Sequence, residues 1–410
     1  ESLEPTMMKP LAGIRVLAIE QFGAGPYGSM YLAELGAEVI KIETHDGDAT
    51  RVLGPMRSPK MAAMFLTLNR NKRSLVLDLK TAAGKDVLWR LIDTADAFVH
   101  NMRPQKITAL GFGDAAVRAR NPALVYAGLT GFRAGGPYSE RPAYDDVIQG
   151  LSGVVGASLA RDGQAQFVPM TLADKLMGVI GAQGILAALI RAVRTGVGCT
   201  LDAGMFEGMT AFTLADHQYR QVFQPPMGPA GYERVTSSHR RPLKTADGYI
   251  CVLPYTDAQF ERFWHAAGRP DLAADPRFQT YRARQENIDD LYALMGEVSQ
   301  TRTSADWLAR LEAAEIPAGP VHGLDDLFDD PHLAAVGFFR DMEHPSEGAL
   351  RLPDTAFQLD GQSLPIRCGP PALGGDGRAI LTELGYSTEA IGALIADGVT
   401  AEPSATGPAR

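Results

Sequence analysis

Residues 13–43 read GIRVLAIEQFGAGPYGSMYLAELGAEVIKIE, and the pattern of this segment is the strongest indication of the fold. An apolar run, Ile14–Ile19, leads into three closely spaced glycines, and a second apolar run ends at an acidic residue, Glu43. The glycines are Gly23, Gly25 and Gly28. This is a G-x-G-x-x-G pattern after a strand, with an acidic residue about 20 positions further on. It predicts a strand, a tight turn, a helix and a second strand.

The same pattern is the usual fingerprint of a dinucleotide site, so an NAD-dependent oxidoreductase is one hypothesis. Glu43 would then bind the ribose. Pro26 lies inside the motif and has no N–H to offer a phosphate, which weakens this interpretation. Glycine-rich turns of this kind also occur in doubly wound folds that bind no nucleotide, so both interpretations stay open at this point.

Composition excludes several classes of protein. The 410 residues carry a net charge of −9, which argues against a nucleic-acid surface. The three cysteines are far apart and fit neither a disulfide framework nor a zinc site: Cys199, Cys251 and Cys368. We therefore expect a cytoplasmic protein without a metal. No signal peptide is evident and no run looks long and apolar enough to span a bilayer, so no membrane association is expected.

Strand-like and helix-like segments alternate over the first 130 residues, which predicts an α/β fold with a mostly parallel sheet. The strand-like runs are Ile14–Glu20, Glu38–Glu43, Ser74–Leu79, Ala97–His100 and Leu124–Leu129. Ligands of such sheets bind beyond the carboxyl ends of the strands. The loops to watch are Glu20–Tyr27, Thr44–Arg51, Lys80–Gly84 and Asn101–Gln105.

The composition also suggests domain boundaries. A first domain is expected over residues 8–220, and a Pro- and Gly-rich linker over 221–239. Residues 240–325 have the pattern of short strands and amphipathic helices, so we expect them to form a smaller second domain. Residues 401–410 look like a disordered tail.

Asp174 is the sharpest single candidate for chemistry. It stands just ahead of a long segment rich in small and apolar residues, Leu176–Val193. A carboxylate in this place is often a helix N-cap. It could instead be a nucleophile, stabilised by the helix dipole, with backbone N–H groups near it to hold an oxyanion.

Five basic residues lie near the expected strand ends: Arg70, Lys72, Arg73, Lys80 and Arg103. Such residues usually form a solvated face, but they would also suit the phosphates of a nucleotide-like ligand.

Seven segments, taken in order, resemble the family III CoA-transferases, a group that includes formyl-CoA transferases, carnitine CoA-transferases and α-methylacyl-CoA racemases. They span nearly the whole chain. The segments are residues 11–43, GDATR (47–51), LNRNKRSLVLDLKTAAGKDVL (68–88), AFVHNMRP (97–104), PAYDDVIQGLSG (142–153), residues 173–205 and LTELGYSTEAI (381–391).

The resemblance implies a Rossmann-like large domain built from both ends of the chain, with a smaller α+β domain inserted. Residues 326–400 would return to complete the large domain. It also implies an intertwined homodimer that uses coenzyme A, rather than NAD, at the glycine loop. Acyl-CoA and a carboxylic acid would be its substrates, with no permanently bound cofactor.

The resemblance places the catalytic aspartate at Asp174. It assigns the CoA contacts to Gly23, Ala24, Leu77, Asp78, Leu79, Lys80, Asn101, Met102, Arg103, Tyr144 and Asp145.

Two departures leave some contacts open. Formyl-CoA members carry arginines at the positions of Thr44 and Ala109. Arg103 or Arg51 would have to replace them. VTSSHRRPL (235–243) stands near the place of their glycine-rich loop, so formate and oxalate are not expected as substrates. His239, Arg240 and Arg241 in this segment would suit a dicarboxylate such as succinate.

The reaction implied by the resemblance passes through a mixed anhydride and then a thioester of CoA, both formed on Asp174. A 2-methylacyl-CoA racemase is an alternative, but racemase members carry histidine where this chain has Tyr144. Tyrosine, with an ordinary pKa of about 10, is a poor base near neutral pH. A non-catalytic acyl-CoA-binding protein is a further alternative, which would not need Asp174.

Overall fold

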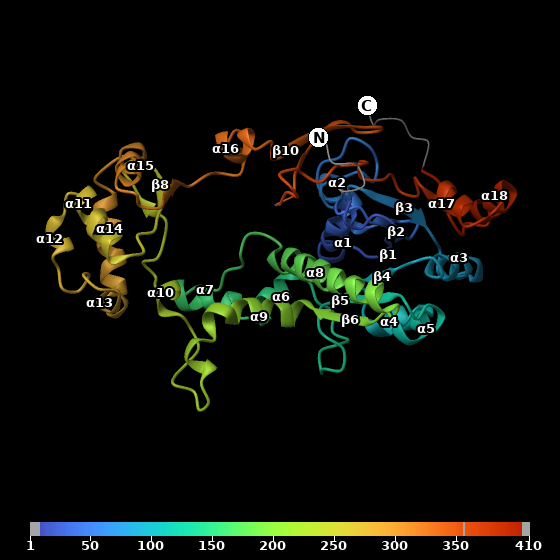
Figure 1. Cartoon of the computed structure of the whole chain (residues 1–410), viewed down its shortest axis with the longest axis horizontal. Coiled ribbons are helices and arrows are strands. Elements are labelled where there is room, and N and C mark those ends of the chain that lie inside the picture. The colour runs from blue at the N-terminus through green and yellow to red at the C-terminus, as the bar shows by residue number, and fades with distance from the viewer. Residues whose placement is uncertain (1–8, 356, 404–410) are drawn as a thin grey trace. The chain divides into compact units, whose positions relative to one another are not determined.

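The computed structural model describes residues 9–355 and 357–403. The chain forms two compact units, and the first is built on a six-stranded sheet with the strand order β3-β2-β1-β4-β5-β6, in which every pairing is parallel (Figure 1). The strands are β1 (Arg15–Ile19), β2 (Glu38–Glu43), β3 (Lys72–Val76), β4 (Ala97–His100), β5 (Val125–Thr130) and β6 (Thr200–Gly204). The α/β fold with a parallel sheet is thus confirmed.

Five of these strands coincide with the strand-like runs of the sequence to within three residues. β6 was missed because the segment TLDAG is short and polar, with none of the continuous apolar character that marks a central parallel strand. It is an edge strand, and its residues are mostly half-buried.

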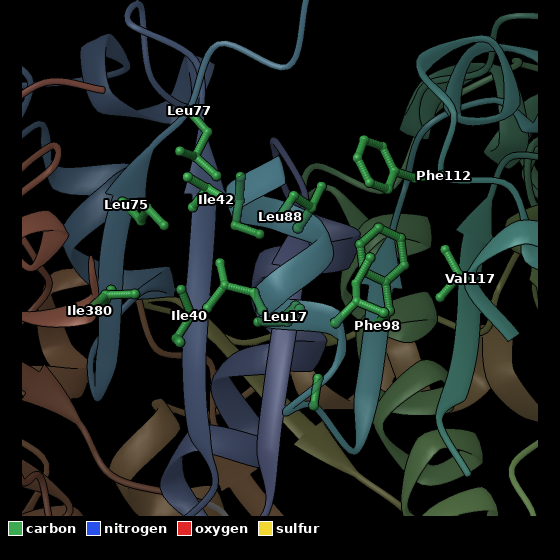
Figure 2. Close-up of a cluster of buried hydrophobic side chains, with 14 of the residues drawn as sticks. Leu17, Ile40, Ile42, Leu75, Leu77, Leu88, Phe98, Phe112, Val117 and Ile380 are labelled. Atoms are coloured by element: carbon green, nitrogen blue, oxygen red, sulfur yellow. The ribbon is translucent and has the colours of Figure 1, made fainter. Parts of the chain in front are cut away.

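Helices cover both faces of the sheet. On one face, α3 (Ala82–Ile92), α4 (Pro104–Leu110), α5 (Asp114–Arg120), α17 (Gly377–Glu383) and α18 (Thr388–Ala396) share one apolar core with the strands. Figure 2 shows Leu17, Ile40 and Phe98 on neighbouring strands with Leu88 of α3 over them. On the other face, α1 (Ala24–Glu34) and α8 (Leu172–Thr195) pack on the strands and on each other.

The last part of the chain completes this unit, which comprises Glu1–Gly153, Phe167–Phe212 and Gly337–Arg410. After the hairpin β10 (Phe339–His344) and β11 (Gly348–Pro353), the chain runs beside edge strand β3. Thr400 Oγ1 donates to Val76 O at 2.7 Å, and Gly374 N donates to Ser74 Oγ at 2.9 Å. The unit also holds α2 (Ala63–Leu68), α6 (Asp145–Leu151), the short helix η1 (Ala49–Val52) and the start of α9 (Met205–His217).

A second unit comprises Val154–Gln166 and Thr213–Val336. A three-stranded antiparallel sheet, β7 (Leu243–Lys244), β8 (Tyr249–Val252) and β9 (Ala318–Pro320), packs with helices around Trp264 and Trp307. The core around the two tryptophans takes residues from α11 (Asp257–Ala266), α12 (Pro270–Ala273), α14 (Ile288–Ser299) and α15 (Ser304–Ala313). The unit also contains α7 (Val154–Asp162), η2 (Tyr219–Val222), α10 (Glu233–Thr236), α13 (Tyr281–Glu286), η3 (Asp325–Phe328) and α16 (Pro331–Ala335).

The expected small domain, residues 240–325, lies inside this second unit, which also takes in residues 154–166, 213–239 and 326–336. Of the expected tail, residues 404–410 lie outside the described part of the chain.

Helix α8 corrects the expectation that no run of the chain is long and apolar enough to span a bilayer. By length and composition alone it is long and apolar enough to cross a membrane, so the sequence does contain such a run. Its small residues instead face other parts of the fold: a Cβ at Gly181 would lie 2.8 Å from Leu129 of β5, and one at Gly184 would lie 3.0 Å from Leu201 of β6. These distances leave room only for glycine unless the neighbours shift.

Helix α8 also packs against α1 so closely that a side chain larger than hydrogen has no room at Gly28. A Cβ at Gly28 would lie 2.8 Å from the backbone oxygen of Gly178, which cannot move aside as a flexible side chain would. We expect Gly28→Ala to lower the free energy of unfolding by about 1–3 kcal/mol, the usual cost of overpacking. Thermal or urea unfolding measures it.

Gly150→Ala is the matched control, since Gly150 is in helix α6 and has no atom within 4 Å of its added Cβ among the described residues. Alanine there should be neutral or stabilise by about 0.5–1 kcal/mol. Equal effects of the two substitutions would contradict close packing of α1 on α8.

Candidate active site

A cleft of about 770 Å³ opens at the carboxyl end of the sheet. The turns after β1 and β4 both contribute to it. Strands β1 and β4 are neighbours at the middle of the sheet, and the strands that follow them in the chain lie on opposite sides of this pair. The carboxyl end of such a pair is where α/β folds usually bind their ligands. All twelve residues that the resemblance singles out line this one cleft: Gly23, Ala24, Leu77, Asp78, Leu79, Lys80, Asn101, Met102, Arg103, Tyr144, Asp145 and Asp174.

Asp174 is the third residue of α8, after the N-cap Thr171. It is therefore not the N-cap that its sequence position suggested. Its carboxylate lies against Gly23, where a Cβ would come within 2.7 Å of Asp174 Cγ. Gly23 thus leaves the space that the carboxylate occupies, which gives the first glycine of the motif a role unrelated to phosphate binding.

Burial, together with the nearby Asp145 carboxylate, raises the pKa of Asp174 to about 6, while Lys175 opposes both effects. Lys175 Nζ donates to Thr171 Oγ1 at 2.9 Å. The Asp174 carboxylate is therefore less well solvated than an exposed one and is mostly ionised at neutral pH.

Asp145 holds the start of α8 in place. It is buried, and its Oδ2 accepts the backbone N–H of Asp174 at 3.0 Å. Its Oδ1 accepts Gln149 Nε2 at 2.6 Å, and Gln149 Oε1 in turn accepts the N–H of Val168 at 2.9 Å. Gln149 is fully buried and was not predicted, because a single glutamine in a helix gives no sequence signal. Together, Asp145 and Gln149 tie α6 to the chain that enters α8.

The turn between β1 and α1 is held by side chains from other loops. Asn101 accepts the N–H of Gln21 at 3.2 Å and donates to Gln21 O at 2.6 Å. Asp48 accepts the N–H of Phe22 at 3.1 Å. The Phe22 ring meets the edge of Tyr144, with centroids 5.7 Å apart, and Tyr144 is exposed. Asn101 is thus tied to the turn. Phe22 and Asp48 lie in two of the loops singled out from the sequence, but neither was named there as a site residue.

The basic residues of the cleft are Lys80, Arg103 and Lys106, and Arg103 donates to Glu140 O at 3.1 Å. The rest of the expected basic cluster is elsewhere. Arg70 pairs with Glu34, Lys72 with Glu20, and Arg73 with Glu38 and Glu383. Arg70 and Lys72 are buried, so they form neither a solvated face nor a phosphate site.

Arg51 is also unable to replace the missing family arginines. It is fully buried, and its guanidinium binds the Glu43 carboxylate at 2.7 Å. This pairing in turn removes Glu43 as a ribose ligand. Thr44 lines the cleft, whereas Ala109 is not among the lining residues.

The three residues expected to suit a dicarboxylate belong to the second unit. There, Arg241 pairs with Asp162 at 2.6 Å and donates to Ser238 O at 2.7 Å. Within residues 9–355 and 357–403, no three His, Cys, Asp or Glu side chains group as a metal site requires.

Comparison with known sequences identifies the family. Residues 11–377 match the family described as CoA-transferase family III. The chain belongs to this family. It is 31% identical to a succinate–glutarate CoA-transferase of Agrobacterium fabrum, over 93% of this chain and 97% of that protein. It is 30% identical to a formyl-CoA:oxalate CoA-transferase of Streptomyces avermitilis, over 96% of this chain and 100% of that protein.

A solved structure agrees. A CAIB/BAIF family protein from Brucella suis superposes with a TM-score of 0.78 at 31% identity, covering 92% of this chain and 99% of the other. The sequence resemblance to family III is therefore confirmed, and the chain is an enzyme of the CoA-transferase class.

The raised pKa of Asp174 predicts a pH-dependent cost to stability. A carboxyl group whose pKa is higher in the folded than in the unfolded protein loses stability as pH rises through both values, here from about 4 to about 6. Above that range Asp174→Asn should be more stable than the wild type by on the order of 1–3 kcal/mol. Below about pH 4 the difference should vanish, because both side chains are then neutral.

Urea unfolding of both proteins at pH 4, 6 and 8 measures this difference. A constant difference across the three pH values would show that Asp174 has an ordinary pKa.

Proposed function

We propose that this family III CoA-transferase moves CoA from an acyl-CoA thioester to a free carboxylic acid, with Asp174 as the nucleophile. The observation that supports this most directly is the position of the Asp174 carboxylate. It is partly desolvated at the wall of the cleft and lies against the backbone at Gly23, where the helix α1 begins.

In the first step, an Asp174 carboxylate oxygen attacks the thioester carbonyl and the C–S bond breaks. This gives a mixed anhydride on Asp174 and free CoA thiolate. The thiolate then attacks the aspartyl carbonyl, releases the acyl group as its carboxylate and leaves CoA as a thioester on Asp174. The acceptor carboxylate then attacks the CoA thioester on Asp174 and releases the thiolate, which attacks the acyl carbonyl of the new anhydride to give the product acyl-CoA and the free Asp174 carboxylate. These steps need no metal or redox group, and charge balances at each of them.

The start of α1 supplies the donors that these steps need. The first N–H groups of a helix have no carbonyl of a preceding turn to bind, and α1 begins at Ala24 directly after Gly23. Gly23 lies next to the Asp174 carboxylate, and its N–H group with that of Ala24 would stabilise the oxyanion of each tetrahedral intermediate. Pro26 has no N–H but comes too late in the helix to remove these two donors.

Coenzyme A would bind along the rest of the cleft. The phosphates of coenzyme A suit the basic residues of the cleft, which are Lys80, Arg103 and Lys106. Its adenine or pantetheine arm would contact the apolar side chains of Leu77, Leu79 and Met102. On this assignment the first unit is the CoA-binding domain.

The acyl group is proposed to be a short dicarboxylate, with succinyl-CoA as donor. The support is the recurrence of this donor among the relatives: a succinyl-CoA:glutarate CoA-transferase of Homo sapiens, 29% identical over 96% of this chain, and a succinyl-CoA–D-citramalate CoA-transferase of Chloroflexus aurantiacus, 30% identical over 93%.

The enzyme is further proposed to act as an intertwined homodimer in the cytoplasm. Several helices of the first unit leave large apolar side chains exposed, which is unusual for a surface that faces only water. They are Val147 and Leu151 of α6, Val179, Ile190 and Val193 of α8, and Phe212 of α9. The three cysteines are free thiols, as a reducing compartment would keep them.

Removal of the proposed nucleophile should abolish transfer. We expect Asp174→Asn to lower kcat for transfer from succinyl-CoA to glutarate by at least about 1,000-fold, because the amide cannot form the anhydride. Hydroxylamine added to the wild type with succinyl-CoA should modify Asp174, which mass spectrometry of peptides detects.

Asp146→Asn is the matched control, since Asp146 is an exposed carboxylate that lines the same cleft. It should keep activity within about threefold of the wild type and still be modified at Asp174. Transfer by Asp174→Asn at the wild-type rate would refute the proposed nucleophile.

The oligomeric state tests the exposed apolar helices. Light scattering should give twice the 44.0 kDa mass of one chain. Ile190→Asp places a charge on the exposed face of α8 and should yield monomers, whereas Ala83→Asp on α3 should leave the dimer intact. A monomeric wild type would contradict the homodimer.

A further inference from the structure

We propose that Asp48 is a positioning residue for the reaction: with Glu20, Lys41 and Lys72 it forms a buried charge network that holds the turn Gln21–Gly23 against Asp174. The proposal rests on the proposed function, in which Asp174 is the nucleophile. It concerns four buried ionisable side chains that have no part in the bond-making steps.

The network lies next to the glycine turn, and two of its members, Glu20 and Asp48, are among the residues that line the cleft. All four side chains are fully buried. Lys41 Nζ lies 2.8 Å from Asp48 Oδ2 and 3.6 Å from Glu20 Oε1, and it donates to Glu20 O at 3.1 Å. Lys72 Nζ contacts Glu20 Oε1 at 3.0 Å. Two carboxyl groups are therefore packed against two amino groups, and burial lowers the pKa of Lys72 to about 8.

The network forms hydrogen bonds to the backbone before, within and after the turn. Lys72 Nζ donates to the backbone oxygen of Pro26 in α1 at 2.8 Å, and Lys41 Nζ donates to that of Glu20, the residue before the turn. Asp48 Oδ1 accepts the N–H of Phe22 at 3.1 Å, in the middle of the turn. Each of these bonds is made to the backbone, so the network acts on the path of the chain between β1 and α1.

Asp48 is the member that fixes the conformation of the turn. Phe22 has φ of 63°, a left-handed conformation that is unfavourable for a bulky side chain. Such a residue persists only where its surroundings hold it. The adjacent Gly23 touches Asp174, so a change at Phe22 would move the backbone that faces the nucleophile.

Asp48 is itself firmly held. Its Oδ1 also accepts the N–H and the hydroxyl of Thr50, both at 2.9 Å. Its own N–H donates at 2.9 Å to Glu43 Oε1, whose carboxylate pairs with Arg51. Burial would raise the pKa of Asp48, but attraction to Lys41 and these hydrogen bonds outweigh it, so the pKa lies below its ordinary value and the group stays ionised.

The chemistry of the network supports a role beyond stability. Buried ion pairs often contribute little net stability, because desolvation offsets their attraction, and apolar residues of similar size would fill the space as well. What apolar residues cannot supply is an acceptor for the N–H of Phe22 and donors for the carbonyls of Glu20 and Pro26.

The test separates positioning from folding with two variants. Asp48→Asn keeps an oxygen but loses the attraction to Lys41. Asp48→Glu keeps the charge but moves the acceptor one methylene further from the backbone. In single-turnover experiments with succinyl-CoA, both should slow hydroxylamine-trapped modification of Asp174 by about 10- to 100-fold, the size of effect expected from a small displacement at a reacting centre. Binding of free CoA, measured by calorimetry, should stay within about threefold.

Glu34→Gln is the matched control. Glu34 is a buried carboxylate paired with Arg70 at the far end of α1, and it does not line the cleft. It should change the unfolding temperature as the Asp48 variants do, yet leave the trapping rate unchanged.

The outcomes distinguish the two proposals. Absence of trapping at Asp174 in the wild type would refute the proposed function. Trapping in the wild type, together with a rate within threefold for either folded Asp48 variant, would overturn the positioning role. Failure of both variants to fold would also overturn it, since Asp48 would then serve the fold as a whole.

Discussion

The contact between helix α8 and the start of helix α1 is the constraint on which the site depends. The two helices approach so closely that a single added carbon at Gly28 would collide with the backbone of α8 at Gly178. One end of the same contact brings the Asp174 carboxylate against Gly23. The glycine motif is therefore a helix-packing device as well as a turn. This explains how it can match a dinucleotide fingerprint in a family that uses coenzyme A.

Charge is placed in this fold in two different ways. Lys80, Arg103 and Lys106 line the cleft, where a phosphorylated ligand can reach them. Lys41, Lys72 and Arg51 are buried in ion pairs with carboxylates beneath or beside the turn. The first group is available to bind a ligand. The second group pairs with buried carboxylates, and its two lysines also donate hydrogen bonds to backbone oxygens. Counting basic residues near strand ends does not separate the two, because successive side chains of a strand point to opposite faces of the sheet and the count does not show which of them are buried.

The parts of the site that were predictable are those with a local or family pattern. Alternating apolar runs identified five strands because a central parallel strand must be apolar on both faces. The resemblance named twelve residues that prove to share one cleft. Gln149, Phe22 and Asp48 were missed because nothing in a single sequence marks a lone amide, a left-handed phenylalanine or an aspartate in a loop. Their importance comes from partners 19 to 26 residues away.

The α/β fold, five of the six strands of the central sheet and the family of CoA-transferases could be read from the sequence, because these follow from periodic apolar patterns and ordered motifs. The three-dimensional structure was needed to show that Asp174 is the third residue of its helix rather than the cap, that Glu43 and Arg51 bind each other, and that Asp48 accepts the N–H of Phe22. The physical reason is that burial and pairing arise between distant segments. A charged residue has the same letter in the sequence whether it faces a ligand, water or a buried partner.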